Sequence, residues 1–386
     1  MKIVHLIDYF QPQVGYQETF LAKEHRKAGH DVCVVTSDRY FPFEGYRSSY
    51  FSLLGERYVG EGERNENGIR TVRLKNIEFP GTNLIYLLKL KRTLADISPD
   101  AVFCHGMYSI TSYFAAKIKN ELGYKLVYDT HAAGFNTQFG TFLKKAYRFF
   151  FRKFAVPLIK DQADSIFAIG EAEQDFICTE FGLNRNHVSI IRLGVDTELF
   201  TASVVKRKEI RKKMGVAADG VVCIFSGKIS PRKDIETLLL AVKKINDTKI
   251  KVLLVGGGKT NHVSDLKKIL DAKELIVEHF VSNDKLPDYY SAADIAVWPG
   301  DPSQGMLEAM SSSLPLIVPE WYGSEFLQKS GGVLFFKRKD IRGLAQKIAK
   351  LSYNKNKRKE IGMNARYYIG RYFSWKEIAR QTLSLL

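Results

Sequence analysis

The chain has 386 residues, of which 45% are hydrophobic and 26% are charged. This composition is ordinary for a globular protein and excludes a disordered chain, and the length favours two domains. No stretch reaches the roughly 18 uninterrupted apolar residues of a membrane-spanning helix, and the apolar start at 2–7 is too short for a signal peptide, so we expect a cytoplasmic protein. The net charge of +16 favours an anionic partner, which the total alone does not identify.

Short apolar segments alternate with helical patterns through the first half of the chain. We expect strands at 2–7, 32–36, 70–74, 101–104, 125–129, 165–169 and 188–192. Between the first two, residues 17–28 have helical periodicity and end at Gly29, which is typical of a helix C-cap. The repeated alternation predicts parallel strands joined by right-handed crossovers, as in a doubly wound α/β domain.

The second half repeats this plan. We expect strands at 221–226, 250–255, 275–277, 294–298, 315–318 and 333–336, and helices at 234–246, 263–271, 285–292 and 305–312. The runs 221–225 and 251–255 are almost continuously apolar, as expected for parallel strands that are covered on both faces. Each half of the chain should therefore build its own parallel sheet.

These patterns divide the chain into an N-terminal domain at 1–196, a C-terminal domain at 197–365 and a helical tail at 366–386. The junction lies near 194–203, where a polar and very basic stretch begins. Two α/β domains predict a cleft, because ligands of open α/β sheets bind beyond the carboxyl ends of the strands.

The four cysteines, Cys33, Cys104, Cys178 and Cys223, lie far apart in the sequence. No pair has the spacing of metal ligands, and three of the four lie inside apolar strand-like segments. We expect buried free thiols and no metal site.

The first motif runs from Phe225 to Asp234, where a strand ends at Gly227 and a helix begins a few residues later. Its basic side chains are Lys228, Arg232 and Lys233. Such side chains at a strand-to-helix turn converge on an anion, and a nucleoside diphosphate fits that requirement. The alternative is an ordinary solvated basic turn.

The second motif follows the strand at 294–298 and contains a loop rich in proline and glycine. Gly305 would allow a phosphate to approach the backbone closely. Glu308, in the first turn of the next helix, can accept hydrogen bonds from two ribose hydroxyls. The alternative is that this carboxylate only matches the helix dipole.

Two weaker motifs also follow expected strands. Gly15 lies in the loop after the first strand, which lacks a GxGxxG pattern and so disfavours a dinucleotide. His131 ends the strand at 125–129 and would point toward the cleft, although a lone histidine is more often structural. The Gly256-Gly257-Gly258 run should form a flexible turn at the same rim. The motifs thus share one kind of position, the carboxyl ends of strands.

These residues resemble the retaining GT-B glycosyltransferases of family 4, also called glycosyl transferases group 1, over nearly the whole chain. The matching segments are Gly194-Val195-Asp196, Leu307-Glu308-Ala309-Met310 with Leu314-Pro315-Leu316-Ile317-Val318, Gly29-His30-Asp31-Val32 and Tyr372-Phe373-Ser374-Trp375. The resemblance implies a GT-B fold, in which two Rossmann-like domains face each other across a cleft and a C-terminal helix crosses back to the first domain.

The resemblance also implies an activity, transfer of a sugar from a UDP- or GDP-linked donor with retention and without a metal. Lys228 and Lys233 would hold the donor diphosphate, although the family usually has arginine at the first position, and Arg232 would assist them. The remaining implied contacts are Glu308 to the ribose, the backbone of Gly305 and Met306 to the phosphates, Gly227 and Gly15 to the donor, and His131 to the transferred sugar.

One departure from the family concerns the donor sugar. The family usually has a second glutamate eight positions before Glu308, where this chain has Gly300. The nearby polar residues that would substitute for it are Asp301, Ser303 and Gln304. Two alternatives therefore stay open, a nucleotide-sugar 2-epimerase of the same fold and a catalytically inactive GT-B homologue.

Residues 142–160 are rich in aromatic and basic residues and contain no acidic residue. Helical spacing places Lys144, Lys145, Arg148 and Arg152 on one face and Phe142, Leu143, Tyr147, Phe150 and Phe154 on the other. A basic amphipathic helix suits an anionic membrane surface, and the alternative is a packed helix with a solvated basic face. The membrane reading places the protein peripherally on the inner face of the cell membrane, with a lipid-linked glycan precursor for a cell-surface polysaccharide as acceptor.

Nucleic-acid binding is the remaining interpretation of the net charge of +16. It would require a recognisable binding module or a basic groove with stacking aromatics. The sequence contains no such module, so we expect no nucleic acid among the partners.

Overall fold

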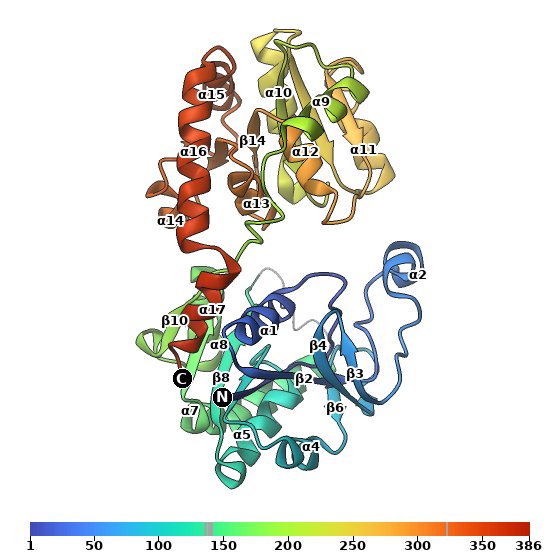
Figure 1. Ribbon diagram of the computed structural model, residues 1–386, viewed down its shortest axis with the longest axis vertical. Coiled ribbons are helices and arrows are strands. Elements are labelled where there is room, and N and C mark those ends of the chain that lie inside the picture. The colour runs from blue at the N-terminus through green and yellow to red at the C-terminus, as the bar shows by residue number, and fades with distance from the viewer. Residues whose placement is uncertain (135–136, 138–141, 322) are drawn as a thin grey trace. The chain divides into compact units, whose positions relative to one another are not determined.

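The computed structural model describes residues 1–134, 137, 142–321 and 323–386, and the chain forms two compact units (Figure 1). The N-terminal unit comprises Met1–Leu193 with Trp375–Leu386, and the C-terminal unit comprises Gly194–Ser374. The first division therefore falls at Leu193 rather than at the predicted 196. The chain returns to the N-terminal unit at Trp375 rather than at 366, because residues 366–372 continue a helix of the C-terminal unit.

The N-terminal unit is built on a sheet with the strand order β10-β9-β8-β7-β1-β2-β4-β3. Its strands are β1 (Lys2–Leu6), β2 (Asp31–Ser37), β3 (Gly62–Glu66), β4 (Ile69–Leu74), β7 (Ala101–Cys104), β8 (Lys125–Thr130), β9 (Ser165–Ala168) and β10 (Val188–Ile190). Neighbouring strands pair in parallel, except that β3 runs antiparallel to β4. The predicted parallel sheet is confirmed, and β3 is a polar edge strand that alternating apolar patterns do not reveal.

Helices and short connections complete this unit. They are α1 (Gln17–Lys27), α2 (Tyr46–Ser49), α3 (Phe51–Leu54), the hairpin β5 (Asn76–Glu78) and β6 (Ile85–Leu87), α4 (Leu90–Ile97), α5 (Ile110–Leu122), α6 (Phe142–Phe150), the π-helical segment η1 (Phe151–Ala155), α7 (Val156–Gln162), α8 (Glu171–Phe181), the 3₁₀ turn η2 (Arg185–His187) and α17 (Trp375–Leu383). The last helix packs beside α1 (Figure 1), where the Trp375 and Phe20 rings stack with centroids 4.9 Å apart. The returning C-terminal helix is thus part of the N-terminal core.

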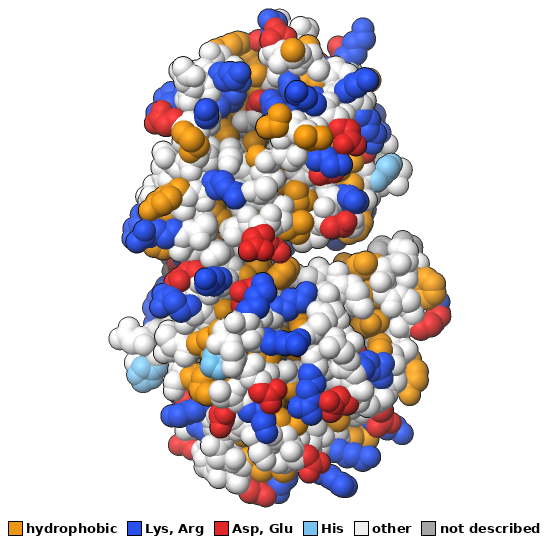
Figure 2. All heavy atoms as spheres, in the orientation of Figure 1, with side chains coloured by type: hydrophobic (Ala, Val, Ile, Leu, Met, Phe, Trp, Pro, Cys, Tyr) orange, Lys and Arg blue, Asp and Glu red, His pale blue; other side chains and the backbone are white. Residues whose placement is uncertain are grey.

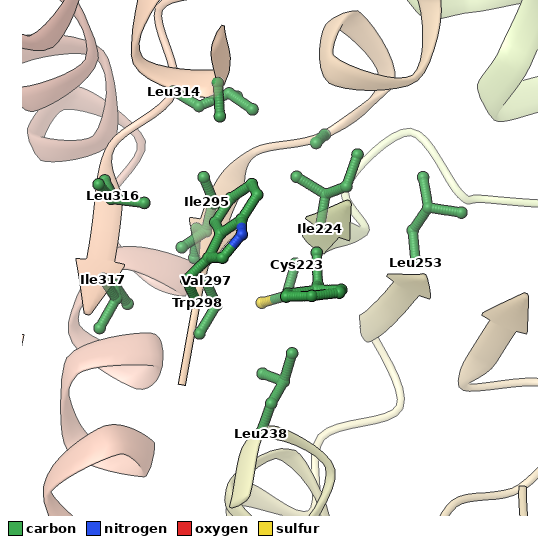
Figure 3. Packing of buried hydrophobic residues seen from close by; sticks show 14 of the residues in the cluster. Cys223, Ile224, Leu238, Leu253, Ile295, Val297, Trp298, Leu314, Leu316 and Ile317 are labelled. Atoms are coloured by element: carbon green, nitrogen blue, oxygen red, sulfur yellow. The ribbon is translucent and has the colours of Figure 1, made fainter. Parts of the chain in front are cut away.

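The C-terminal unit contains an all-parallel sheet with the strand order β13-β12-β11-β14-β15-β16. Its strands are β11 (Val221–Ser226), β12 (Ile250–Val255), β13 (Leu275–Glu278), β14 (Ile295–Val297), β15 (Leu316–Pro319) and β16 (Val333–Phe336). Every residue of β11 is buried, as the continuous apolar run predicts for a strand covered on both faces. Figure 3 shows this core, in which Leu238 points from its helix toward the sheet residue Cys223.

The helices of this unit are α9 (Val204–Lys213), the 3₁₀ turn η3 (Pro231–Lys233), α10 (Ile235–Ile245), α11 (Thr260–Leu266), α12 (Leu286–Ala292), α13 (Gly305–Ser311), α14 (Glu325–Gln328), α15 (Ile341–Ser352) and α16 (Lys355–Tyr372). The very basic stretch after the junction contains α9. Two of its arginines, Arg207 and Arg211, donate to the Asp294 carboxylate at 2.7 and 3.0 Å. Part of the basic charge therefore stabilises this unit internally.

Cys33, Cys104 and Cys223 are buried free thiols, as predicted, and Cys178 is half-buried. Among the described residues, no helix is long and apolar enough to cross a membrane.

Candidate active site

The carboxyl ends of β11 and β14 lie next to each other in the C-terminal sheet. The chain runs from β11 to β12 on one side and later adds β14 on the other side, so the winding direction reverses between β11 and β14. Ligands of open α/β sheets bind at such a reversal. The two segments that we expect to bind the donor, 227–233 and 299–308, follow these two strands. The fold therefore brings the two strongest sequence motifs together.

Lys233 joins these two segments. Its ammonium group donates hydrogen bonds to the backbone oxygens of Asp301 and Pro302, both at 2.9 Å. Burial lowers the pKa of Lys233, while the Asp301 carboxylate opposes that shift. Since an ammonium has three N–H donors, two of them fix the neighbouring loop and one is left for a ligand.

Gly300 lies where the backbones of the two segments touch. A Cβ atom at this position would lie 2.5 Å from the carbonyl carbon of Lys233 and still closer to the oxygen of Arg232. The backbone N–H of Asp301 donates to that same Arg232 oxygen at 3.0 Å. The position at which family 4 usually has a glutamate is therefore filled by backbone packing, and a side chain would have to push the two segments apart.

Asp301 is held between two arginines. Its carboxylate accepts from Arg232 Nε at 2.7 Å and from Arg338 Nη2 at 2.8 Å. Burial alone would raise the pKa of Asp301, but the two arginines outweigh burial and keep it below its usual value. An ionised carboxylate bound by two guanidinium groups anchors the loop, and a role of Asp301 in place of the family glutamate stays a prediction.

Gly227 and Lys228 follow β11 at the same edge. The backbone N–H of Gly227 donates to Val255 at 2.9 Å, and that of Ile229 donates to Gly257 at 2.7 Å. The expected flexible turn at 256–258 is therefore wrong, because these glycines continue the pairing of β11 with β12. The side chain of Lys228 is exposed and makes no ion pair among the described residues.

Glu308 lies in the first turn of α13 and is half-buried. Burial raises the pKa of its carboxyl group to about 7, and a hydrogen bond from the Tyr290 hydroxyl at 3.3 Å acts in the opposite direction. The same hydroxyl lies 2.5 Å from Ser226 Oγ and 3.1 Å from the backbone oxygen of Gly305. Tyr290 thus connects the end of β11 to the start of α13 and orients Glu308.

The other predicted donor-binding residues in this loop are engaged within the unit. The hydroxyl oxygen of Ser303 accepts from Trp298 Nε1 at 2.9 Å, and the Gln304 amide donates to the backbone oxygen of Gly194. The side chain of Met306 is buried in the core, and its backbone N–H donates to Ser303 at 3.1 Å. The Met306 backbone N–H thus has a partner within the loop, and its contact with a phosphate stays a prediction.

Gly305 packs against three side chains. A Cβ atom there would lie 2.8 Å from Ser226 Oγ and 2.9 Å from Trp298 Cζ2. Glycine at this position is accordingly required by the close approach of α13 to the sheet, independently of any phosphate.

Gly15 and His131 belong to the N-terminal unit, so the structure does not bring them together with the basic cluster within one unit. Gly15 follows β1 with φ +75°, and His131 follows β8 with an exposed surface. Nearby atoms nevertheless crowd the ring, and this desolvation lowers the pKa of His131 against the pull of the Asp129 carboxylate. Both residues lie at the carboxyl edge of their sheet, as predicted.

The aromatic helix α6 differs from the expectation. Arg148 donates to both carboxylate oxygens of Glu180 at 2.6 Å, so it belongs to an internal ion pair rather than to a basic surface. The side chains exposed on α6 and η1 are mainly apolar: Phe142 (83% exposed), Phe149 (65%), Leu143 (59%), Phe154 (51%) and Phe150 (44%). We call these five residues the aromatic patch.

Sequence reasoning missed Tyr290, Arg338 and a buried group of three histidines, His5, His25 and His105. Arg338 follows β16, so the rule that sites gather at strand ends would have found it. Tyr290 and the histidines have no local signal, because their partners are far away in the sequence.

The described residues contain no group of three or more acidic, histidine or cysteine side chains that is arranged to hold a metal ion. Figure 2 shows Lys and Arg side chains scattered over the visible face of each unit and interspersed with Asp and Glu. On that face the described residues form no continuous basic stripe of the kind that follows a nucleic-acid backbone.

Comparisons with known proteins agree with this architecture. The model of Glycosyltransferase Family 4 matches residues 19–199, and the model of Glycosyl transferases group 1 matches residues 206–368. An uncharacterised glycosyltransferase of Methanocaldococcus jannaschii is 24% identical over 99% of this chain and 97% of its own. TuaC of Bacillus subtilis, a glycosyltransferase named for teichuronic acid biosynthesis, is 28% identical over 43% of this chain and 41% of its own.

Among solved structures, HepE of Anabaena in complex with UDP superposes with a TM-score of 0.72 at 18% identity, over the full length of both chains. Two α/β units with parallel sheets and a helix that returns to the first unit define the GT-B fold. Since the two family matches together span most of the sequence, the chain belongs to the GT-B glycosyltransferases of the family 4 type.

Proposed function

We propose that this glycosyltransferase moves a sugar from a nucleoside-diphosphate sugar to an acceptor, with retention at the anomeric carbon and without a metal. The observation that carries the proposal is the position of Lys233, Arg232 and Glu308, which follow β11 and β14 at the reversal of strand order in the C-terminal sheet. A nucleoside diphosphate needs cations for its phosphates and an acceptor for its ribose hydroxyls, and this edge offers both.

In the proposed reaction, the bond between the anomeric carbon and the diphosphate oxygen breaks. Negative charge grows on the leaving phosphate, where Lys228, Arg232 and Lys233 stabilise it. The acceptor hydroxyl attacks from the same face, the new carbon–oxygen bond forms there, and the acceptor proton passes to the departing phosphate. By the resemblance to family 4, we place His131 beside the transferred sugar.

The complex of HepE with UDP favours a uridine nucleotide as the first donor to test, with GDP beside it. We expect one of UDP, GDP, ADP and TDP to raise the melting temperature, because ligands that bind only the folded state stabilise it. No shift with any of them would favour an inactive homologue. Product analysis with the matching nucleotide sugar separates transfer from 2-epimerisation.

Removal of the Lys233 ammonium is expected to weaken binding of that nucleoside diphosphate about 10- to 100-fold, because a charge-assisted hydrogen bond contributes roughly 1.5–3 kcal/mol. The Lys233→Ala variant should bind the corresponding nucleoside, which has no phosphate, almost as well as the wild type. Titration calorimetry with both ligands measures the difference. The control is Lys244→Ala, at an exposed position of α10; equal diphosphate affinity in all three proteins would refute the assignment.

The acceptor proposal rests on the aromatic patch. Next to it, an apolar pocket of about 230 Å³ is lined by Ile110, Tyr113, Phe114, Tyr147, Phe150 and Phe151. Lys153 lies over the Phe149 and Phe154 rings at 5.7 and 5.6 Å, and Lys145 and Arg152 are exposed nearby. Exposed aromatics flanked by cations suit the interface of an anionic bilayer. We therefore propose a lipid-linked glycan acceptor at the inner face of the cell membrane, which the relative named for teichuronic acid biosynthesis also favours.

Replacing Lys145 and Lys153 by glutamate is expected to weaken binding to vesicles of anionic lipid at least about tenfold, since each basic residue contributes roughly 1 kcal/mol near such a surface. Co-sedimentation with vesicles measures this. The control variant, Lys355→Glu with Lys359→Glu on α16, makes the same change in net charge in the C-terminal unit.

The aromatic side chains of the patch should contribute to vesicle binding separately from the basic ones. Phe149→Ser with Phe154→Ser should reduce vesicle binding even in high salt, where electrostatic attraction is screened. Sedimentation of both patch variants at the wild-type level would exclude the patch as a membrane surface.

A further inference from the structure

Three buried histidines form a row through the core of the N-terminal unit. His105 Nε2 lies 2.9 Å from His5 Nδ1, and His5 Nε2 lies 3.1 Å from His25 Nδ1. His5 and His25 are fully buried and His105 is 8% exposed. Each ring nitrogen of His5 therefore faces a nitrogen of another ring, so the tautomers of the three rings depend on one another.

Both ends of the row are closed by polar groups. At one end, His105 Nδ1 lies 2.5 Å from the Asp129 carboxylate in β8, which also accepts from the backbone N–H of Gly106 at 2.8 Å. At the other end, His25 Nε2 lies 2.9 Å from Thr382 Oγ1 in α17. The hydroxyl of Thr382 is also 2.9 Å from the backbone oxygen of Ala379. We call Asp129, the three histidines and Thr382 the histidine chain.

Hydrogen-bond chemistry allows two arrangements of this chain. An ionised Asp129 only accepts, so His105 donates to it from Nδ1. If His105 is neutral, its Nε2 accepts, and His5 and His25 then both donate from Nδ1, which leaves Thr382 to donate to His25. If His105 carries a second proton, its Nε2 donates to His5 Nδ1, and His5 Nε2 donates to His25 Nδ1. His25 Nε2 then donates to Thr382 Oγ1, and the Thr382 hydroxyl donates to the backbone oxygen of Ala379. The two arrangements differ by one proton.

The surroundings place that proton at the Asp129 end. Burial lowers the pKa of His5 well below its usual value and that of His25 to about 3, and the neighbouring histidines act in the same direction. Burial also opposes a charge on His105, but the Asp129 carboxylate outweighs burial and raises the pKa of His105.

The other titratable groups that face the chain are Glu18 on α1, His131 after β8 and His30 after α1. Glu18 raises the pKa of His105, whereas His30 lowers that of His25. His131 lowers the pKa of Asp129. These neighbours therefore keep an imidazolium next to Asp129 and neutral rings farther along the chain.

We propose that Asp129, His105, His5, His25 and Thr382 act as one proton-sharing chain, in which uptake of a proton beside Asp129 reverses the hydrogen bond that anchors α17 through Thr382. The chain begins at the strand end that carries His131 and ends on the helix with which the polypeptide returns from the C-terminal unit. Its members hold α17 in place, and none of them is assigned a contact with a substrate. The inference is independent of the transfer reaction.

The test is a pH titration of the full-length protein labelled with ¹⁵N, followed through the ring nitrogens by NMR over roughly pH 6 to 10, because the pKa of His105 lies above its usual value of about 6.5. As the pH falls, His105 should become doubly protonated while the single proton of His5 and that of His25 move from Nδ1 to Nε2. All three changes should share one midpoint. Fixed tautomers of His5 and His25, or separate midpoints, would overturn the proposal.

Two sets of variants separate the chain from a merely structural role. Asp129→Asn removes the carboxylate that holds the added proton, so its chain should stay neutral and show no tautomer change. Thr382→Val removes the hydroxyl, whereas the control Thr382→Ser keeps it. Hydrogen exchange in α17 should depend on the His105 titration in the wild type and in Thr382→Ser, but not in Thr382→Val. If Asp129→Asn does not fold, the comparison of Thr382→Val with Thr382→Ser still tests the proposal. Equal hydrogen exchange in α17 of these two variants would show that the Thr382 hydroxyl does not anchor the helix.

Discussion

Replacing Gly300 by alanine is expected to lower the free energy of unfolding by about 2–4 kcal/mol. The added Cβ would lie 2.5 and 2.6 Å from the carbonyl carbon and oxygen of Lys233, and neither atom belongs to a flexible side chain. The loop must then move away, which breaks the hydrogen bonds from Lys233 to Asp301 and Pro302. For a unit of this size the melting temperature should fall by about 5–10 °C.

The same displacement should weaken binding of the nucleoside diphosphate, because Lys233 loses the two carbonyl groups that fix its ammonium. The control is Gly257→Ala on the neighbouring loop, where nothing lies within 4 Å of the added Cβ. Calorimetric unfolding and ligand titration of both variants measure the two effects. An unchanged melting temperature for Gly300→Ala would show that the loop moves at no cost.

Gly300→Glu extends this test to the family pattern. It restores the carboxylate that family 4 usually has at this position, but its Cβ meets the same backbone atoms. We therefore expect it to lose as much stability as the alanine variant and to gain no activity. A gain in transfer activity would show that the loop accepts the family arrangement.

The strands and most of the fold could be predicted from the sequence because each buried parallel strand is a short apolar run. The edge strand β3 could not, since its sequence, Gly62–Glu66, is polar and three of its five residues are exposed. Periodicity predicted the helix α6 but not the environments of its side chains. Arg148 pairs with Glu180, which lies on another helix, and such a partner leaves no local trace in the sequence.

The candidate site shows the same limit. The rule that ligands bind at the carboxyl ends of strands placed Lys233 and Glu308 on one sheet edge, as observed. The hydrogen bonds of the site residues depend on partners that are distant in the sequence. Arg338 donates to Asp301, and Tyr290 donates to Glu308. The absence of the family glutamate is visible in the sequence, whereas its cause, backbone packing at Gly300, requires the structure.

Nucleotide binding is expected to strengthen about tenfold between pH 6 and pH 8, because the Glu308 carboxyl group must be ionised to accept hydrogen bonds from the ribose. Burial raises its pKa to about 7, so most molecules carry a protonated Glu308 at pH 6 and an ionised one at pH 8. The Glu308→Gln variant should bind weakly over the whole range and lack this dependence. Titrations of both proteins with the same nucleotide cancel the ionisation of the phosphates themselves.

Ionisation of Glu308 should lower the free energy of unfolding, although the same ionisation strengthens nucleotide binding. Because the pKa of Glu308 is higher in the folded state than in the unfolded chain, the folded protein loses stability as the pH rises from about 4.5 through 7. Glu308→Gln does not titrate, so at pH 8 it should be more stable than the wild type by about 1–2 kcal/mol, after allowance for partial solvent exposure. A variant that is more stable yet binds the nucleotide more weakly is the signature of a carboxylate that serves a ligand. If wild type and variant show the same pH dependence of binding, Glu308 does not contact the ribose.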